Sequence, residues 1–328
     1  MKKRFNVFIT GVSGFIGQKI IERFSERDDV GKIIGIDVVA PPRLRERITF
    51  IEHDVRDDMA PLMSGYKIDW AIHAAFVVSI LHDKKLMEDV DINGTVNFLN
   101  ACAKNKIKHV MHMSSTTAYG AHEDNPPLLG EDAPLRGNEG FIYGMSKAKL
   151  ELTAVREFFE RHPDVCGSIV RPCFVCGPHF YKNTLGRHLM KRIVMLPGDM
   201  RPFQFVHEDD VADSMYHLLA KRQRGAFNLA ADGTMTFREM LDLTGGTPLP
   251  IHPALLYPLN DLAWMLRLSF VTEFPSAPMA LIRFPWIASN DKIKNAGYRF
   301  KYTTREAFET FAELVLNFKG RGNSVVFK

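Results

Sequence analysis

The sequence has little of what would set it apart from ordinary globular proteins. Four cysteines in 328 residues are too few for a disulfide framework in a chain of this length. No run of about 18 uncharged apolar residues is present, so we expect no integral membrane segment. Basic residues exceed acidic ones by only four and are spread along the chain, so we expect no nucleic-acid partner. The apolar stretch near the start ends at Ile9, too short for a signal peptide, and the cytoplasm is the expected location.

Two of the cysteines form a C-x-x-C pair, an arrangement that zinc proteins and redox proteins share. A zinc site needs about four ligands, and the sequence offers no second close pair. A redox pair of the thioredoxin type would open a helix, whereas this pair lies among Ile, Val and Phe. We therefore expect no metal site and four buried free thiols: Cys102, Cys166, Cys173 and Cys176.

Short apolar runs alternate with longer segments of helical period in the first half of the chain. Strands that are apolar on both faces and separated by helices predict a doubly wound α/β fold with a parallel sheet. The expected strands are 5–10, 32–37, 49–53, 69–75, 109–115 and 165–171. The expected helices of this half are 15–27, 84–105 and 143–161.

After Pro172 this rhythm breaks, and short helices over 208–221, 236–244 and 304–317 alternate with loops. Residues 226–230 look like one further strand that returns to the sheet. The expected division is a sheet domain of residues 1–172, to which 205–230 returns, and a smaller interleaved substrate region formed by 173–204 and 231–328.

The most apolar part of the second half is the stretch 253–288. We expect it to form a core helix or a helix that lines a pocket. Contact with a membrane surface or with a second subunit is the alternative.

A glycine-rich turn follows the first expected strand directly and precedes an amphipathic helix. Gly11 permits the tight turn, Gly14 lets the backbone approach a pyrophosphate, and Gly17 lets the helix pack against the strand. The N–H groups and the dipole of the helix then face the anion. This strand–turn–helix context predicts a dinucleotide-binding loop.

An acidic residue, Asp37, stands twenty residues after Gly17, at the end of the second expected strand. A carboxylate there can accept hydrogen bonds from the adenosine ribose and would repel a 2′-phosphate. This favours NAD over NADP. Arg43 and Arg45 follow closely and would serve a 2′-phosphate if their loop folded back, so NADP stays open.

Tyr143 and Lys147 are four residues apart on one expected helix face, close enough to act together. A phenol is a poor base near neutral pH, but an adjacent ammonium favours the phenolate. Tyr143 can then exchange a proton with a substrate hydroxyl or carbonyl while hydride moves at the attached carbon. Ser115 and Thr116 lie at the carboxyl end of a strand, where open α/β sheets bind ligands. A hydroxyl there can orient the substrate oxygen.

Taken together, these motifs resemble the extended short-chain dehydrogenase/reductases, the group that includes NAD-dependent epimerases and dehydratases. The resemblance runs nearly end to end. It assigns Ser115, Tyr143 and Lys147 to catalysis, and it gives Lys147 a second role on the nicotinamide ribose. It implies a small-molecule substrate held by Ser115, Thr116, Tyr143 and Phe174. The cofactor residues that it implies are Gly11, Ser13, Gly14, Phe15, Ile16, Gly17, Asp37, Asp54, Val55, Ala74, Ala75, Phe76, Asn93, Met113, Tyr143, Lys147, Pro172 and Val175.

The resemblance also carries expectations about packing and assembly. His207, Asp209 and Asp210 match a family marker, which makes them hinge and packing groups and not a metal site. Members of the family often dimerise through two long helices, which here would be 84–105 and 143–161.

Departures from the family pattern narrow the chemistry. Family dehydratases carry an Asp-Glu pair just after the catalytic hydroxyl, whereas Thr116 and Thr117 follow Ser115, which disfavours a 4,6-dehydratase. Nucleotide-sugar enzymes commonly have an Asn at the place of Phe174 and an Arg-Asp at the place of Phe203-Gln204. The loss of these polar anchors suits a less polar ligand.

Three functions therefore stay open. The first is an epimerase-like enzyme acting on a sugar or sugar nucleotide, in which tightly held NAD takes a hydride and returns it. The second is a dehydrogenase or reductase of a less polar alcohol or ketone that exchanges its cofactor at each turnover. The third is a non-catalytic dinucleotide sensor that keeps only the fold.

Overall fold

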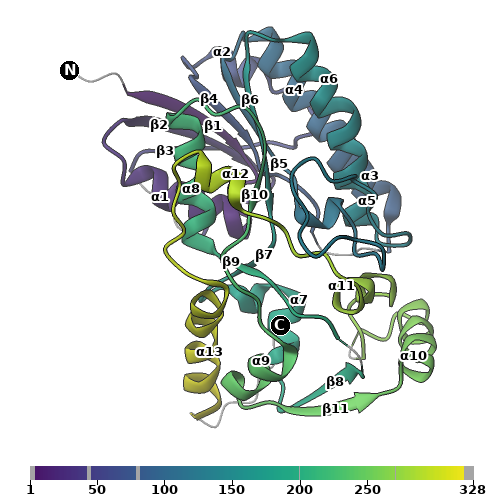
Figure 1. Cartoon of the computed structure of the whole chain (residues 1–328). Coiled ribbons are helices and arrows are strands. Elements are labelled where there is room, and N and C mark those ends of the chain that lie inside the picture. The colour runs from purple at the N-terminus through teal and green to yellow at the C-terminus, as the bar shows by residue number, and fades with distance from the viewer. Residues whose placement is uncertain (1–3, 43–45, 79–81, 199, 270, 321–328) are drawn as a thin grey trace.

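A seven-stranded parallel sheet forms the centre of the molecule in the computed structural model, which describes residues 4–42, 46–78, 82–198, 200–269 and 271–320 (Figure 1). Its strand order is β10-β6-β5-β4-β1-β2-β3. The doubly wound α/β fold predicted from the sequence is thereby confirmed. The bounds are β1 Phe5–Thr10, β2 Val30–Asp37, β3 Ile48–Glu52, β4 Trp70–His73, β5 His109–Met113, β6 Cys166–Pro172 and β10 Gly225–Leu229.

The order of the strands reverses between β1 and β4, because the chain passes from β1 outward to β3 and then returns to the other side of β1. Crevices at such a switch point, outside the carboxyl ends of the strands, are where open α/β sheets bind ligands. The carboxyl ends of β1, β4, β5 and β6 therefore meet at one edge, and the sheet presents the residues that follow these strands side by side.

Helices cover both faces of the sheet (Figure 1). On one face, α1 (Phe15–Ser25) packs beside α8 (Glu208–Ala220), with Ile20, Phe24 and Met215 in the core between them and the sheet. The other face is covered by α2 (Ala60–Ser64), α4 (Gly94–Lys104), α5 (Ile142–Leu150) and α6 (Arg156–Arg161).

Each of the two long helices predicted from the sequence contains one π-helical turn. The first runs from α3 (Lys84–Glu88) through a π turn at Asp89–Asn93 into α4. The second runs from α5 through a π turn at Glu151–Val155 into α6. Such turns occur frequently at functional sites. The sequence periodicity indicates the two helices but not the turns, since a single inserted residue hardly alters the pattern.

A second, smaller region lies beyond the carboxyl edge of the sheet and has a core of its own (Figure 1). Two small parallel sheets contribute to it, β7 (Phe174–Cys176) with β9 (Phe205–His207), and β8 (Ile193–Pro197) with β11 (Thr247–Ile251). Its helices are α7 Thr184–Leu189, α9 Phe237–Thr244 and α13 Thr304–Gly320. Aromatic side chains dominate the core: Phe180, Phe203, Phe205, Phe308 and Phe311 are fully buried.

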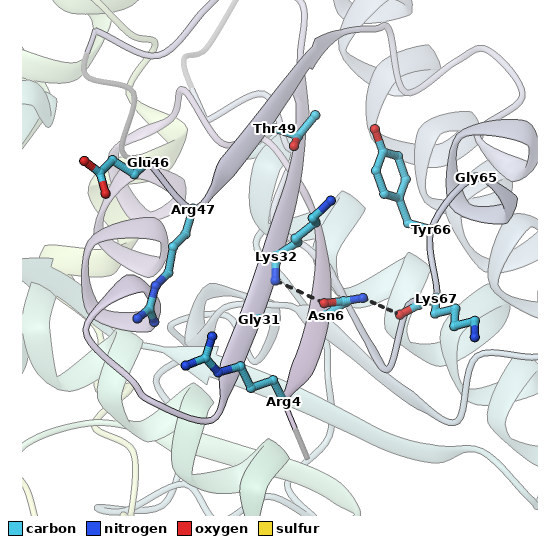
Figure 2. A pocket seen from close by; sticks show the side chains of 10 residues that line it. All are labelled: Arg4, Asn6, Gly31, Lys32, Glu46, Arg47, Thr49, Gly65, Tyr66 and Lys67. Carbon is cyan, nitrogen blue, oxygen red and sulfur yellow. Dashed lines mark hydrogen bonds between the residues drawn. The ribbon is translucent and has the colours of Figure 1, made fainter. Parts of the chain in front are cut away.

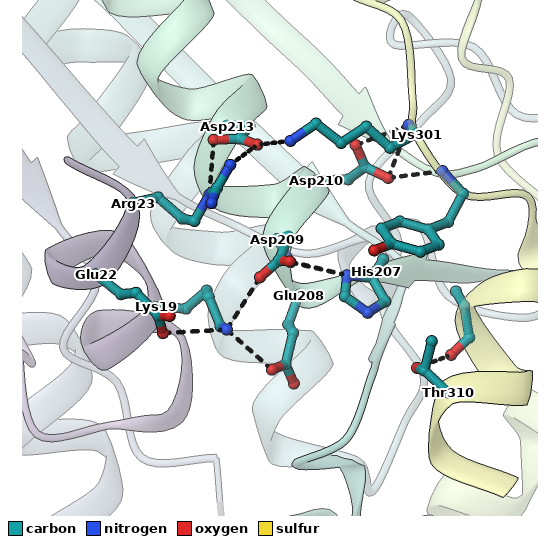
Figure 3. A network of polar contacts seen from close by, with 12 residues as sticks. Lys19, Glu22, Arg23, His207, Glu208, Asp209, Asp210, Asp213, Lys301 and Thr310 are labelled. Atoms are coloured by element: carbon teal, nitrogen blue, oxygen red, sulfur yellow. Dashed lines mark hydrogen bonds and ion pairs between the residues drawn. The ribbon is translucent and has the colours of Figure 1, made fainter. Parts of the chain in front are cut away.

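An ion-pair network fastens α1, α8 and the segment before α13 to one another (Figure 3). The buried Asp213 carboxylate lies 2.9 Å from Arg23 and 2.5 Å from Lys301. Asp210 accepts hydrogen bonds from the Tyr298 hydroxyl and from the backbone N–H of Lys301. Asp209 pairs with Lys19. These acidic groups of the family marker thus bind cations and backbone donors, which is a packing role.

The apolar stretch 253–288 divides into two unlike parts. Its later part contributes the buried side chains of Leu281 and Trp286 to a small core at α11 (Ala280–Arg283). Its earlier part, α10 (Pro253–Met265), buries only Ala263. The expectation of a core or pocket-lining helix is therefore wrong for α10, whose aliphatic side chains face outward.

All four cysteines are buried free thiols, as the sequence predicted. Burial raises the pKa of the Cys173 and Cys176 thiols, which keeps them in the unreactive neutral form. Within the described part of the chain, no helix is long and apolar enough to cross a bilayer.

Candidate active site

The glycine turn between β1 and α1 holds the chain close to the loop that follows β4. Gly11 adopts a φ of +75°, and a Cβ there would lie 2.6 Å from the backbone of Ala75. A Cβ at Gly17 would lie 2.0 Å from the Gly11 carbonyl oxygen. Only glycine fits these two positions. Side chains are thus kept away from the first turn of α1, whose N–H groups lack partners within the helix and can receive a pyrophosphate.

Asp37 lies directly beside this turn, at the end of β2. Its Oδ2 accepts a hydrogen bond from the Ser13 N–H at 2.9 Å, and its Oδ1 accepts one from the Val38 N–H at 2.8 Å. The carboxylate is thereby fixed at the mouth of the turn, where the adenosine ribose of a dinucleotide would lie. Phe15 and Ile16 begin α1 immediately behind the turn. Arg43 and Arg45, the residues that left NADP open, lie outside the described residues.

The loop after β4 forms the other wall of the dinucleotide crevice. The Thr10 hydroxyl accepts hydrogen bonds from the N–H groups of Ala74 and Ala75 at 3.2 and 3.1 Å. The same hydroxyl lies 2.8 Å from a ring nitrogen of His73. These bonds join the carboxyl ends of β1 and β4, and they direct Ala74, Ala75 and Phe76 toward the switch point.

Three of the expected cofactor residues, Asp54, Val55 and Asn93, have different surroundings in the structure. Both carboxylate oxygens of Asp54 bind the Arg56 guanidinium, which lowers the pKa of Asp54. Val55 is buried against Gly94. Asn93 is a correction: its side chain is exposed and donates to Asp89 at 2.6 Å, because the π turn directs it away from the sheet.

The residue of that motif that points into the site is Asp91, which sequence reasoning missed. Its side chain is fully buried, and its Oδ1 accepts a hydrogen bond from the Val77 N–H at 2.8 Å. Its Oδ2 is buried with no hydrogen-bond partner in the described chain. Asp91 and Asn93 are two residues apart, and a shift of two residues moves a side chain to the opposite face of a helix. Only a sequence signal for the π turn at 89–93 would have identified Asp91.

Ser115, Tyr143 and Lys147 come together at the carboxyl end of β5. Ser115 follows that strand, and α5 brings Tyr143 and Lys147 over it, with Gly144 so close to the Thr117 carbonyl that a Cβ would lie 2.9 Å away. Burial raises the pKa of Tyr143 to about 12, and a hydrogen bond with Ser115 opposes that rise. The three predicted catalytic residues therefore share one site.

Lys147 is buried among an aromatic ring, a carbonyl and two carboxylates. Its Nζ donates to the Met113 carbonyl at 2.5 Å and lies 3.4 Å from the centroid of the Phe76 ring. Burial lowers the pKa of Lys147, while the negative charges of Asp91 and Glu151 oppose that shift. Each of these carboxylates stands on one of the two π turns.

Glu151 is tied to a buried network that does not reach the reacting atoms. Its carboxylate binds the Arg171 guanidinium, with Oε2 3.0 Å from Nε, and Arg171 also donates to the Tyr119 hydroxyl at 2.5 Å. Tyr119 in turn donates to Asn228 on β10 at 2.7 Å. Glu151 is paired with Arg171, whereas no arginine pairs with Asp91 in the described part of the chain. The negative charge of Asp91 therefore acts on the Lys147 ammonium more directly.

The substrate side of the site is aromatic. The Phe174 ring lies 5.4 Å from Trp286 and 5.8 Å from Phe203, centroid to centroid. Beside it, the Pro172 carbonyl accepts long hydrogen bonds from the Ser115 and Thr116 hydroxyls at 3.5 and 3.4 Å. Val175 is partly buried against the sheet core.

Gln204 stands where nucleotide-sugar enzymes commonly have the Asp of an Arg-Asp pair. Its side-chain oxygen accepts from the Ala288 N–H at 3.0 Å, and its nitrogen donates to the Ala231 and Ala288 carbonyls at 3.1 Å. The amide is fully engaged within the protein. It joins two segments of the chain and is not directed at a ligand.

A groove of about 610 Å³ opens at the opposite edge of the sheet (Figure 2). It lies at the amino ends of β1 and β2, where Asn6 accepts from the Lys32 N–H and donates to the Lys67 carbonyl, both at 3.0 Å. None of the predicted catalytic or cofactor residues lines it. Ligand sites of parallel sheets lie at the carboxyl edge, so this groove is not the reaction centre.

The fold and the site together define an enzyme of the dinucleotide-binding α/β class, with a half-buried tyrosine and a buried lysine and serine beside the cofactor crevice. Comparison with known proteins makes the class specific. Residues 7–230 match the model of the NAD dependent epimerase/dehydratase family, and the chain belongs to that family. It is thus an NAD-dependent enzyme, as the sequence predicted.

Relatives and solved structures extend the likeness over nearly the whole chain. An uncharacterized protein of Mycobacterium tuberculosis is 25% identical over 327 residues, covering 96% of this chain and 84% of the relative. A 3 beta-hydroxysteroid dehydrogenase/Delta 5-->4-isomerase of Vaccinia virus is 29% identical over 153 residues, covering 44% and 43%. The structure of UDP-glucose 4-epimerase from Thermotoga maritima with UDP-glucose superposes with a TM-score of 0.74 at 20% identity, covering 97% of this chain and all of the other. That likeness shows the fold.

Proposed function

We propose that this chain exchanges a hydride between NAD and a secondary alcohol or ketone of low polarity, with Tyr143 as the acid–base group. The observation that carries the reaction type is the cluster of the half-buried Tyr143 with the buried Ser115 and Lys147 at the carboxyl end of β5. NAD, when bound, supplies the hydride acceptor. The Gly11–Gly17 turn and Asp37 would hold it, because both leave room and polar groups where its pyrophosphate and ribose belong.

Tyr143 must lose a proton to act as a base, and its surroundings oppose this in the free chain. Burial raises the pKa of the phenol, and the charge of Asp91 adds to the rise. Ser115 stabilises the phenolate by a hydrogen bond and can orient the substrate oxygen. Lys147, when charged, lowers the pKa of the phenol through its nearby positive charge.

Asp91 acts through Lys147 in this proposal. The ammonium loses hydration when it is buried, so its proton is held only if a negative charge lies nearby. Asp91 supplies that charge and also binds the Val77 N–H, which fixes the loop that carries Phe76. It is therefore a positioning residue for the ammonium and for the wall of the cofactor crevice.

The low polarity of the substrate follows from Phe174 and its neighbours. The half-buried Phe174 ring is backed by the buried rings of Phe203 and Trp286, and the Gln204 amide is fully used by internal hydrogen bonds. A charged diphosphate would find few donors in this neighbourhood. A relative whose printed name is a 3 beta-hydroxysteroid dehydrogenase agrees with such a substrate.

A sugar or sugar-nucleotide epimerase is the second candidate. It is favoured by the likeness to the structure of UDP-glucose 4-epimerase, which covers 97% of this chain and all of the other. The two candidates share Tyr143, Lys147 and Ser115. They differ in whether the hydride leaves the enzyme with the cofactor or returns to the same substrate.

Net cofactor turnover separates the candidates. Purified protein is dialysed, then supplied with NAD and either a 3β-hydroxysteroid, a long-chain secondary alcohol or UDP-glucose, and NADH is followed by its absorbance. We expect NADH in proportion to alcohol consumed, and about 10³-fold slower formation of NADH by Tyr143→Phe. Conversion of UDP-glucose to its epimer without external cofactor would support the epimerase instead. A sensor would bind NAD and turn over nothing.

The proposed function also assigns a role to each of the two regions of the chain. We propose that residues 1–172 with 205–230 bind NAD, and that 173–204 with 231–328 bind the substrate. Supporting this, β10 and α8 belong to the sheet layer, while Phe174 and Trp286 reach the reaction centre from the second region. A homodimer through the two long helices and a cytoplasmic location remain part of the proposal.

A further inference from the structure

Helix α10 has the reverse of the usual arrangement of a surface helix. A surface helix normally turns its apolar stripe to the core and its polar side to water. In α10 and the residue after it, the outward side chains are aliphatic and 47–69% exposed: Leu255, Leu259, Leu262, Met265 and Leu266. We call these five side chains the α10 stripe. At about 100° per residue they fall on one side of the helix.

Two polar residues hold α10 in place, the half-buried Asn260 and the exposed Asp261. Asn260 donates to the Phe274 carbonyl at 2.9 Å and to the Ser276 hydroxyl at 3.2 Å. Asp261, the one charged residue of the helix, accepts a hydrogen bond from the Ser276 N–H at 2.6 Å. The exposed stripe is therefore not the result of a loose helix. Specific bonds hold α10 with its apolar side outward.

Positive charges flank the α10 stripe. Arg267 follows the helix directly, and Arg283 lies close enough to Tyr257 to lower the pKa of its hydroxyl against the larger effect of burial. Neither arginine forms an ion pair with a carboxylate in the described part of the chain. Lys84 and Lys85 are exposed at the start of α3, just beyond His82, whose ring stacks on Trp264 at 3.8 Å. The acidic neighbour Asp83 is engaged as the N-cap of α3.

An aliphatic stripe bordered by unpaired cations is the chemistry of a helix that lies in the interface of an anionic membrane. A second protein chain fits less well. Each partner in a stable interface contributes roughly 20–30 residues, whereas the α10 stripe has five. In Figure 1, α10 stands at the periphery of the second region, where a flat surface could reach it.

We propose that α10 docks this enzyme on the surface of an anionic lipid bilayer, with the α10 stripe among the acyl chains and Arg267, Arg283, Lys84 and Lys85 at the headgroups. The helix lies on the membrane and does not span it. The Trp264–His82 contact joins the docked helix to the residues just before α3.

Vesicle co-sedimentation of the full chain tests the proposal without any assay of turnover. The probes are vesicles of phosphatidylcholine with phosphatidylglycerol, and vesicles of phosphatidylcholine alone. We expect binding to the anionic vesicles, weaker binding to the neutral ones, and a loss of at least about tenfold in partitioning for Leu259→Glu/Leu262→Glu. The matched control is Leu316→Glu, an exposed leucine of α13 that lies outside the stripe and should bind as the wild type does.

The variants must be shown to be folded, by unchanged circular dichroism and unchanged NADH binding. Equal binding of the double variant and the wild type, or no binding of the wild type, would overturn the proposal. A wild-type dimer that Leu259→Glu/Leu262→Glu dissociates, with no vesicle binding, would overturn it in favour of self-association. Because none of these readings involves catalysis, a failure here is distinct from a failure of the proposed reaction.

Discussion

The two regions of this molecule bury different kinds of side chain around the same reaction centre. At the carboxyl edge of the sheet, the buried groups are polar and engaged with one another, as Thr10 and His73 are. In the second region the core is apolar and rich in phenylalanine, and Phe174 and Trp286 face each other beside the site. A dinucleotide is the same for every member of the family, so its half must keep polar groups at fixed places. The polarity of the substrate half can instead match the ligand of each member.

The largest expected effect belongs to the sheet region. Tyr143→Phe removes the hydroxyl that exchanges the substrate proton and keeps the ring that contacts Phe76. We expect turnover to fall by about 10³-fold, in the range of general acid–base catalysis, with NADH binding unchanged. Steady-state rates and NADH fluorescence titration measure the two quantities. Full turnover in this variant would remove Tyr143 from the chemistry.

Asp37→Ala probes the cofactor end of the same region. The carboxylate repels a 2′-phosphate and is held at the ribose site by Ser13 and Val38. Loss of its charged hydrogen bonds should reduce the preference for NAD over NADP by about 30-fold. The ratio of kcat/KM for the two cofactors measures it, and Asp54→Ala serves as a comparison within the same crevice. An unchanged ratio would exclude Asp37 from cofactor selection.

Phe174→Asn tests the second region, because it introduces the polar group that nucleotide-sugar enzymes commonly carry there. We expect about a tenfold loss of kcat/KM for an apolar alcohol, through lost contact with Phe203 and Trp286. NAD binding should stay as it is. A loss of NAD affinity in the same variant would show that Phe174 contributes to cofactor binding as well as to substrate binding.

The smallest effect is expected from Asp91→Asn, and only at alkaline pH. The amide keeps the shape of the side chain but loses the charge that supports the Lys147 ammonium, so the pKa of Lys147 falls further. Activity needs that ammonium, and the alkaline limb of the pH profile should therefore move to lower pH, with a several-fold loss on that limb. At acid pH the two proteins should agree, because burial raises the pKa of Asp91 and wild-type Asp91 is then protonated as well.

The other ionisable groups around Lys147 do not blur this comparison. Glu151 is paired with Arg171 in both proteins, so its effect on the pKa of Lys147 is the same in each. Burial lowers the pKa of His73 and His112, so both rings are neutral over the range of the experiment. Identical alkaline limbs in Asp91→Asn and wild type would show that Asp91 is only a structural acceptor for the Val77 N–H.

The difference between the regions also explains which features of the structure could be predicted from the sequence and which could not. Gly11, Asp37 and the Tyr143–Lys147 spacing are local signals, since each is placed by a strand or a helix that its own neighbourhood specifies. Asn93 was assigned from the family resemblance alone, and its side chain is exposed, whereas Asp91, two residues earlier in the same π turn, is buried in the site. Similarly, the outward face of α10 depends on anchoring by residues 274–276, which no local pattern contains.

The measurement that tests the central claim most directly is the balance of NADH formed against substrate consumed, with wild-type protein and Tyr143→Phe in parallel. The account predicts one NADH for each molecule of a low-polarity secondary alcohol oxidised, and about 10³-fold slower formation of NADH by the variant. Substrate converted with no net NADH, or equal NADH from both proteins, would contradict it.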